Sequence, residues 1–276
     1  MPIILGVLAS FFIGVSDTAG RASARRASAI SHVSTQMAVG IFVAFPAVLL
    51  VDSAWVWSDA ISAALSGVFI ALGLSIVYRA MADSSSAIAA PLAGVLAALI
   101  PLGWDLLGGT SITALTLVGS AIAIVSMAIV TFDPFLDGST IRKGVAWALI
   151  GGIFFGVSNT LAGNTSELSG AWPAVLNRGF GFLALIPLVL SSRVPMFLKP
   201  PVLRIGVLGG FAGAFGTLAF VIGAQQGNLG TVAVLAATYP AVIVVLTSIF
   251  DDDHIRWWQA IGVAGAVAGT VLIALG

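Results

Sequence analysis

Apolar residues gather along this chain in about ten long runs, which short polar stretches separate. The runs are continuous, as residues 39–51 illustrate, whereas the strands of a membrane barrel would alternate between apolar and polar positions. A helix of about 20 residues crosses the bilayer core, and its backbone groups bond to one another where water is absent. The pattern predicts an all-α membrane protein with ten transmembrane helices, at Ile3–Gly20, Ile30–Val51, Ala60–Ala82, Ser86–Leu107, Thr113–Phe132, Gly144–Ala162, Trp172–Ser191, Leu203–Gln225, Leu229–Phe250 and Trp257–Leu275.

The composition indicates a chain that is solvated mainly by lipid. Apolar residues make up 59% of the 276 positions, charged residues only 8%, and the mean hydropathy is +1.12. Eleven basic and eleven acidic side chains are too few to cover a soluble domain of this size. A net charge of zero argues against a nucleic-acid partner, and the absence of cysteine excludes disulfides and cysteine-bound metals. We expect no cofactor and no metal site, and we assign the apolar N-terminus to the first membrane helix, since it lacks the features of a signal peptide.

Tryptophan and basic residues mark the predicted helix ends. All seven tryptophans lie at or near such an end, where the indole ring can sit among lipid headgroups. Ten of the eleven Lys and Arg residues lie in or beside connectors that share one face of a ten-helix bundle, opposite both termini. The positive-inside rule would place that face in the cytoplasm. The basic residues concerned are Arg21, Arg25, Arg26, Arg79, Arg142, Lys143, Arg193, Lys199, Arg204 and Arg256.

The chain repeats a short pattern 142 positions apart. Residues 12–18 read FIGVSDT and residues 154–160 read FFGVSNT, so that five of seven positions match. Because each half then holds five helices, an odd number, the second half must enter the membrane from the opposite side, as in transporters with inverted repeats. We predict a first five-helix repeat at 1–132, a connector at 133–143 and a second repeat at 144–276. The alternative is that membrane helices rich in Gly and Ala resemble one another by composition alone.

Three motifs point to a known family. Both halves open with an aromatic-Gly-x-Ser pattern, Trp172-Pro173 is followed by Arg178, and residues 251–256 (DDDHIR) precede a Gly-rich last helix. Together they resemble the EamA-type transporters of the drug/metabolite transporter (DMT) superfamily. The resemblance implies a multi-pass transporter with both termini in the cytoplasm, which opposes the orientation that the basic residues indicate. The first half departs from the pattern, with Gln36 near the place of the family arginine.

Asp17 is the foremost functional candidate, because it is the only acid well inside a predicted span. An ionised carboxylate at mid-membrane costs roughly 2.5–3.5 kcal/mol on insertion scales, so such residues usually face a cavity where they bind a cation or carry a proton. The alternative is a pair with Arg21, one turn away on the same helix face. Its counterpart in the second half is the neutral Asn159. We therefore take Asp17 as the candidate proton-coupling group.

Other polar residues inside the spans are candidates for the lining of a substrate cavity. Hydroxyls such as Ser16 and Ser158 can instead bond to the preceding helical turn. Arg178 could hold a substrate carboxylate or extend to lipid headgroups. The cavity set that we predict is Ser16, Asp17, Gln36, Tyr78, Ser158, Asn159, Arg178, Gln225 and Tyr239.

Two further features concern helix faces and bends. His32 and Gln36 are four positions apart and share a helix face, but a lone histidine near a helix end is more often an interfacial residue. Pro91 and Pro240 lie in the fourth and ninth spans, where each could bend a gating helix or be a tolerated kink.

These features predict a multi-pass transporter of small organic metabolites such as amino acids, which acts as an exporter in the cell (inner or plasma) membrane. It would work by alternating access between two inverted repeats, with proton coupling at Asp17, and its functional unit would be a monomer in the lipid bilayer. A facilitative uniporter or pore without ion coupling is the first alternative. An integral membrane enzyme is the second, which the sequence supports poorly because it has neither HExxH nor GxSxG and its two histidines are far apart.

Overall fold

The computed structural model describes residues 1–83, 86–131, 138–250 and 256–276, and within these ranges every regular element is a helix. The long helices satisfy their own backbone hydrogen bonds, which lipid could not do for them. In chain order the elements are α1 (Pro2–Ala24), α2 (Ala29–Ala44), α3 (Ala47–Leu50), α4 (Trp57–Asp83), α5 (Ser86–Leu107), α6 (Ala114–Thr131), α7 (Gly138–Gly163), the 3-10 turn η1 (Glu167–Ser169), α8 (Trp172–Ser192), α9 (Leu203–Gln225), α10 (Leu229–Ala236), α11 (Tyr239–Phe250) and α12 (Trp257–Leu275).

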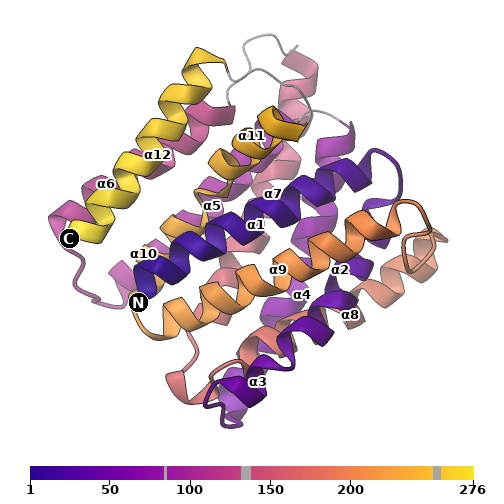
Figure 1. Cartoon of the computed structure of the whole chain (residues 1–276), viewed down its shortest axis with the longest axis horizontal. Helices are drawn as coiled ribbons and strands as arrows, with labels where there is room; N and C mark the ends of the chain where they lie inside the picture. The colour runs from indigo at the N-terminus through magenta and orange to yellow at the C-terminus, as the bar shows by residue number, and fades with distance from the viewer. Residues whose placement is uncertain (84–85, 132–137, 251–255) are drawn as a thin grey trace.

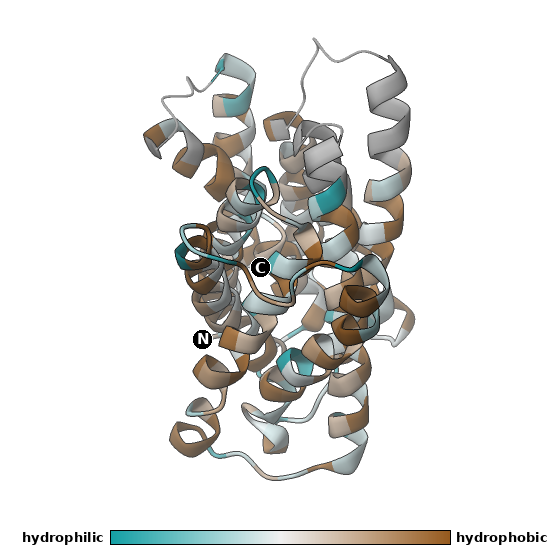
Figure 2. Cartoon of the chain, turned by 90° about the vertical axis from the view of Figure 1, so that its right-hand side faces the viewer, coloured by the Kyte–Doolittle hydropathy of each residue, from teal (hydrophilic) through white to brown (hydrophobic). Residues whose placement is uncertain are grey.

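The described helices confirm the predicted all-α membrane fold. Eight of them are long and apolar enough to span a bilayer within the described ranges, and two shorter apolar segments, Ala93–Leu107 and Ala114–Val130, complete a set of ten. Large apolar side chains lie on the outside of the bundle, as the 80% exposed Phe42 illustrates. Figure 2 shows that brown, hydrophobic positions predominate along the helices and that teal, hydrophilic ones are few. The exterior is therefore suited to contact with lipid tails.

Most predicted boundaries agree with the structure, and those of α5, α9 and α12 agree to the residue. The predicted connector at 133–143 is an exception, because α7 already begins at Gly138. Residues 132–137 lie outside the described ranges.

Two predicted spans are each divided into two helices. The second span consists of α2 and α3, with Pro46 at the junction, and the ninth consists of α10 and α11, which Ala237 and Thr238 separate. Proline has no N–H to donate to the fourth residue before it, so Pro240 cannot continue the hydrogen bonding of α10. It is tolerated in the first turn of α11, where such a bond is not required. The interruption lies beside the cavity described below.

The helices form an inner group and a peripheral pair. Helix α1 packs along α9 and the α10–α11 segment, while α4 packs along α7 and α8, and α2 lies against both α8 and α9. Helices α6 and α12 pack mainly on each other and lie to one side of the bundle in Figure 1. Both chain termini lie on the same face, at the left of that view, and the α1–α2 and α8–α9 connections lie on the opposite face.

Glycine allows the peripheral pair to approach closely. A Cβ atom added to Gly119 of α6 would lie 2.8 Å from the carbonyl oxygen of Gly269 in α12, and one added to Gly269 would lie 2.7 Å from the carbonyl oxygen of Gly119. Small residues at such crossings let backbones approach one another in membranes.

Candidate functional site

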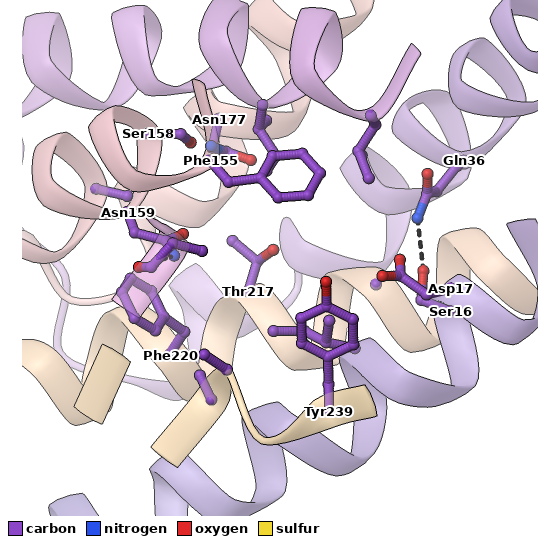
Figure 3. A pocket seen from close by; sticks show the side chains of 18 of the residues that line it. Ser16, Asp17, Gln36, Phe155, Ser158, Asn159, Asn177, Thr217, Phe220 and Tyr239 are labelled. Carbon is purple, nitrogen blue, oxygen red and sulfur yellow. Dashed lines mark hydrogen bonds between the residues drawn. The ribbon is translucent and has the colours of Figure 1, made fainter. Parts of the chain in front are cut away.

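A cavity with about 770 Å³ of empty volume lies where the inner helices converge (Figure 3). Its wall is formed by residues of α1, α2, α4, α5, α7, α8, α9, α10 and α11. The lining residues are Ile13, Ser16, Asp17, Gln36, Ile70, Leu74, Ala97, Phe155, Ser158, Asn159, Ala162, Asn177, Arg178, Gly213, Thr217, Phe220, Ala236, Ala237 and Tyr239.

Ser16 connects three helices at the edge of this cavity. Its hydroxyl donates to the carbonyl oxygen of Gly209 in α9 at 2.9 Å, and it accepts a hydrogen bond of 2.5 Å from Nε2 of Gln36 in α2 (Figure 3). The serine is therefore held by contacts between helices and does not bond to its own preceding turn.

Ser158 makes the corresponding hydrogen bond in the second half of the chain. Its hydroxyl donates at 3.0 Å to the carbonyl oxygen of Ser66 in α4, and Nδ2 of Asn177 donates at 2.7 Å to the hydroxyl of the same Ser66. Ser158 lies 142 positions after Ser16, and Gly209 lies 143 after Ser66. A serine donor and a backbone carbonyl acceptor thus recur at nearly the same offset, with the two halves of the chain exchanged.

Glycine contacts recur at the same offset. A Cβ atom on Gly14 would meet Val242 at 2.6 Å, and one on Gly156 would meet Ile100 at 2.5 Å. Gly156 lies 142 positions after Gly14, and Val242 lies 142 positions after Ile100, so that each glycine meets a residue from the other half of the chain. The first helix of each half therefore packs closely on the fourth apolar segment of the other half.

The two sides of the cavity differ in polarity. Four of the corresponding pairs differ in polarity or charge: Asp17 and Asn159, Thr217 and Leu74, Tyr239 and Ala97, and Gln36 and Arg178. In the first three pairs the more polar member comes from α1, α9 or α11, and both α9 and α11 pack on α1; in the fourth the charged member, Arg178, comes from α8. The wall formed by α4, α5 and α7 is more apolar, and Phe155 extends it across the cavity in Figure 3.

Asp17 is an almost fully buried acid, with 5% of its side chain exposed. The hydroxyl of Tyr78, on α4, donates to its Oδ1 atom at 2.7 Å. The Tyr78 ring can approach α1 because Gly20 has no side chain in its way. Tyr78 itself is completely buried and lies behind the cavity wall, so it positions Asp17 and does not line the cavity.

Arg178 is a buried cation that links three helices. Its Nη2 atom donates to the carbonyl oxygen of Gly213 and to the hydroxyl of Thr217, both in α9, and Nη1 lies 3.6 Å from the sulfur of Met37 in α2. Only 4% of Arg178 is exposed, so the guanidinium does not extend to the bilayer surface. It supplies positive charge at the cavity wall.

Comparison with known proteins decides the family. Residues 142–275 match the model of the EamA-like transporter family. This match covers the second half of the chain and places the protein in the EamA-like transporter family. That family is part of the drug/metabolite transporter superfamily, so this is a membrane transporter.

A solved structure supports the fold over the whole chain. The structure, titled only "Crystal structure of protein", aligns with 99% of this chain and 96% of its own, with a TM-score of 0.77 and 16% sequence identity. At this identity the likeness concerns the fold alone. No curated protein matches the sequence.

The structure of this EamA-like transporter brings together seven of the nine predicted cavity residues. The seven that line the cavity are Ser16, Asp17, Gln36, Ser158, Asn159, Arg178 and Tyr239. Tyr78 contacts the set through Asp17. Pro240 lies in the first turn of α11, beside the helix interruption, whereas the side chain of Pro91 in α5 lies outside the described residues.

Two placements expected from the sequence are corrected. Gln225 lies outside the central cavity, where its amide donates to the hydroxyl of Thr165 and the carbonyl oxygen of Gly170, because α9 carries it to the bundle end. His32 is not interfacial: its ring is completely buried and meets the ring of Tyr78 edge-on at 5.5 Å, because α9 covers the start of α2.

Several cavity residues of the transporter were not among the predicted ones. Asn177, Thr217, Phe155 and Phe220 all line the cavity. Asn177 directly precedes Arg178, and Thr217 lies in a stretch of α9 that is otherwise small or apolar, so an isolated polar residue within a span was the available signal. No comparable signal distinguishes the two phenylalanines from those that face lipid.

A second, more open hollow of about 820 Å³ lies near the face that carries the termini. Asp59 lines it and accepts hydrogen bonds from the backbone N–H and hydroxyl of Ser166 and from the hydroxyl of Ser169. Asp105 also lines it, and its Oδ2 atom accepts a 2.7 Å bond from the N–H of Gly230, in the first turn of α10. Both acids join segments of the first half of the chain to segments of the second half.

Proposed function

We propose that this protein carries small organic metabolites, such as amino acids, out of the cell across the cell membrane by alternating access. The observation that carries the proposal is the pair of equivalent contacts around one central cavity, with Ser16 bonded to Gly209 and Ser158 bonded to Ser66. On this basis residues 1–132 and 144–276 are the two inverted repeats, and residues 133–143 lie between them.

The recurrence of these contacts supplies a mechanism. Two halves that make the same hydrogen bonds and glycine contacts have interfaces of similar stability, so the arrangement seen on one side can be exchanged with that on the other. Such an exchange would open the cavity to one face of the membrane and then to the other. The helix interruption at Ala237 and Thr238 lies in the cavity wall, where it can absorb a change of direction.

Asp17 is the proposed proton-coupling residue. Its carboxyl group lines the cavity and is shielded from water, and one of its oxygens is held by Tyr78. A buried carboxylate must be compensated by hydrogen bonds, by a cation or by a proton. The corresponding Asn159 cannot titrate, so a single coupling site per chain is expected.

The cavity suits a substrate with both charged and apolar parts. Asp17 and Arg178 place opposite charges on its wall, and Leu74, Phe155 and Phe220 provide apolar surface. Amino acids combine these properties, and their transport involves no covalent chemistry, in keeping with a carrier and not an enzyme.

The test is transport by the purified protein in proteoliposomes, with a mixture of the twenty ¹⁴C-labelled amino acids as the probe. We expect accumulation that depends on a pH gradient. Asp17→Asn, which cannot carry a proton, should abolish this accumulation. Asp52→Asn, at an exposed loop position, is the matched control and should behave as the wild type.

Each alternative has its own outcome in this assay. Gradient-driven accumulation that is unchanged in Asp17→Asn would contradict coupling at that residue. Flux that is independent of pH in the wild type would indicate a facilitative uniporter. Absence of flux for every amino acid would contradict the proposed substrate class.

A further inference from the structure

Two buried amide oxygens in the cavity wall have no hydrogen-bond partner. Gln36 is 2% exposed and Asn177 is 3% exposed, and within the described residues Oε1 of the first and Oδ1 of the second are unpaired. A buried polar atom without a partner destabilises the folded protein, because it has lost its bonds to water. Both residues line the cavity, so a bound molecule can supply the missing donors.

The neighbouring hydroxyl group fixes which end of the Gln36 amide is free. The single hydroxyl hydrogen of Ser16 is donated to the carbonyl oxygen of Gly209, so toward Gln36 this hydroxyl can only accept. The amide nitrogen of Gln36 must therefore face Ser16, and its oxygen must point away, as Figure 3 shows. The free atom is thus an acceptor, which calls for a donor on the ligand.

The same reasoning applies to Asn177. Ser158 donates to the carbonyl oxygen of Ser66, and the hydroxyl of Ser66 accepts from Nδ2 of Asn177. The hydroxyl of Ser66 in turn donates to the hydroxyl of Ser158, 3.0 Å away, so the hydroxyl hydrogens of both serines are used. Oδ1 of Asn177 is therefore a second free acceptor.

Charge distinguishes the two ends. Asp17 follows Ser16 directly and so adds a carboxylate beside Gln36, whereas the second half has the neutral Asn159 after Ser158. Arg178 lies near this end as well, since a Cβ atom on Gly213 would lie 3.0 Å from Nε2 of Gln36 and 3.5 Å from Nη2 of Arg178. Its Nη2 is already bonded to Gly213 and Thr217, and its unpaired Nε lies beside Gly40 of α2. The end at Asp17 and Gln36 therefore combines a carboxylate with a free acceptor atom, beside a guanidinium whose Nη2 donates to α9.

We propose that the group recognised in this cavity is a primary ammonium, which binds between the carboxylate of Asp17 and Oε1 of Gln36. The apolar part of the ligand then lies against Leu74, Phe155 and Phe220. This inference rests on the proposed function and narrows it: the amino group of the substrate is required for recognition, and its carboxylate is not.

The test compares three ligands that share a benzyl body. Phenethylamine carries only the ammonium, 3-phenylpropionate only the carboxylate, and L-phenylalanine both. Binding to the purified full-length protein is measured by calorimetry and by the shift in melting temperature. We expect binding of phenethylamine and L-phenylalanine, and binding of 3-phenylpropionate at least tenfold weaker than that of phenethylamine, which corresponds to roughly 1.4 kcal/mol.

Variants at the two amides locate the binding site. Gln36→Met removes the acceptor and is expected to weaken phenethylamine roughly tenfold, the typical effect of losing a hydrogen bond from a charged donor. Gln36→Glu keeps acceptor oxygens at the same place and should bind phenethylamine at least as well as Gln36→Met does. Asn177→Leu removes the acceptor at the neutral end and should weaken binding less than Gln36→Met. Melting temperatures without ligand report whether each variant is folded.

The outcomes separate this inference from the proposed function. Preferred binding of 3-phenylpropionate, or equal binding of phenethylamine to wild type and Gln36→Met, would overturn the ammonium site. Amino-acid flux without binding of any amine would also overturn it while leaving transport in place. Amine binding that depends on Gln36, in a protein without flux, would support the site and count against transport.

Discussion

Ser16 and Ser158 illustrate how one residue can join two helices and also line the central cavity. Each hydroxyl donates to a backbone carbonyl of a helix from the other half, and each cluster contains an amide that lines the cavity. By contrast, Thr18 and Thr160, two positions further on, bond only to carbonyl groups of their own preceding turns. The repeated motif therefore contains one hydroxyl that joins helices and one that does not.

This difference predicts unequal effects of two similar substitutions. Ser16→Ala removes a bond to Gly209 and leaves the amide of Gln36 without its acceptor, so the free energy of unfolding should fall by about 1–3 kcal/mol. Thr18→Ala removes only a bond within its own helix and should change it by about 0.5 kcal/mol or less. Reversible unfolding in mixed micelles measures both; equal losses would contradict the assigned role of Ser16.

The residues that could be predicted were polar ones inside the spans, first of all those in the repeated motif. Asp17 and Asn159 were recognisable because a polar residue inside a membrane span is unfavourable unless it faces a partner or a cavity. The structure places both at the cavity. Gln225 and His32 were misplaced, because the depth of a residue along its helix and the helix that covers it are not visible in a linear pattern. The roles of both cavity phenylalanines depended on the rotation of their helices.

At the scale of helices, close approach at glycine holds the bundle together. Lipid tails are as apolar as leucine, so membrane helices gain little from hydrophobic burial against one another and depend on tight contact. Gly119 and Gly269 provide such contact between α6 and α12, whereas Gly179 of α8 has no atom within 4 Å of where its Cβ would be. Glycine therefore permits a close helix crossing at Gly119 and Gly269 but has no such role at Gly179.

Alanine substitutions at the two kinds of glycine should have opposite signs. Gly119→Ala places a methyl group against backbone atoms of α12, so the helices must separate, at a cost of about 1–3 kcal/mol. Gly179→Ala meets no neighbour and should stabilise the helix by roughly 0.5–1 kcal/mol. The melting temperatures of the two variants in the same detergent, compared with that of the wild type, test both expectations. A higher melting temperature for Gly119→Ala would contradict the close crossing.

For the whole molecule, the distribution of charge indicates an orientation in the membrane. The connectors at 51–56, 108–113, 164–171 and 226–228, on the face that carries the termini, contain no Lys or Arg. The opposite face carries Arg25, Arg26, Arg193 and Lys199, all exposed. Short loops rich in basic residues remain in the cytoplasm, so the positive-inside rule places the termini outside it.

Single cysteines can test this orientation, since the chain has none of its own. Leu168→Cys lies on the face of the termini and Ser191→Cys on the opposite face, and both positions are exposed. In intact cells a membrane-impermeant maleimide should label Leu168→Cys and should label Ser191→Cys only after permeabilisation. The reverse pattern would favour the orientation implied by the family resemblance, and labelling of both in intact cells would contradict the ten-helix count.

The sequence by itself determined the helices, because in lipid each span must satisfy its own backbone and so depends mainly on local composition. It also indicated the repeat, since Ser16 and Ser158 recur with their neighbours. Only the tertiary structure decided that Gln36, Asn177 and Thr217 meet in one cavity. That outcome depends on how far each helix is rotated and where it crosses its neighbours, and these follow from contacts between residues far apart in the chain.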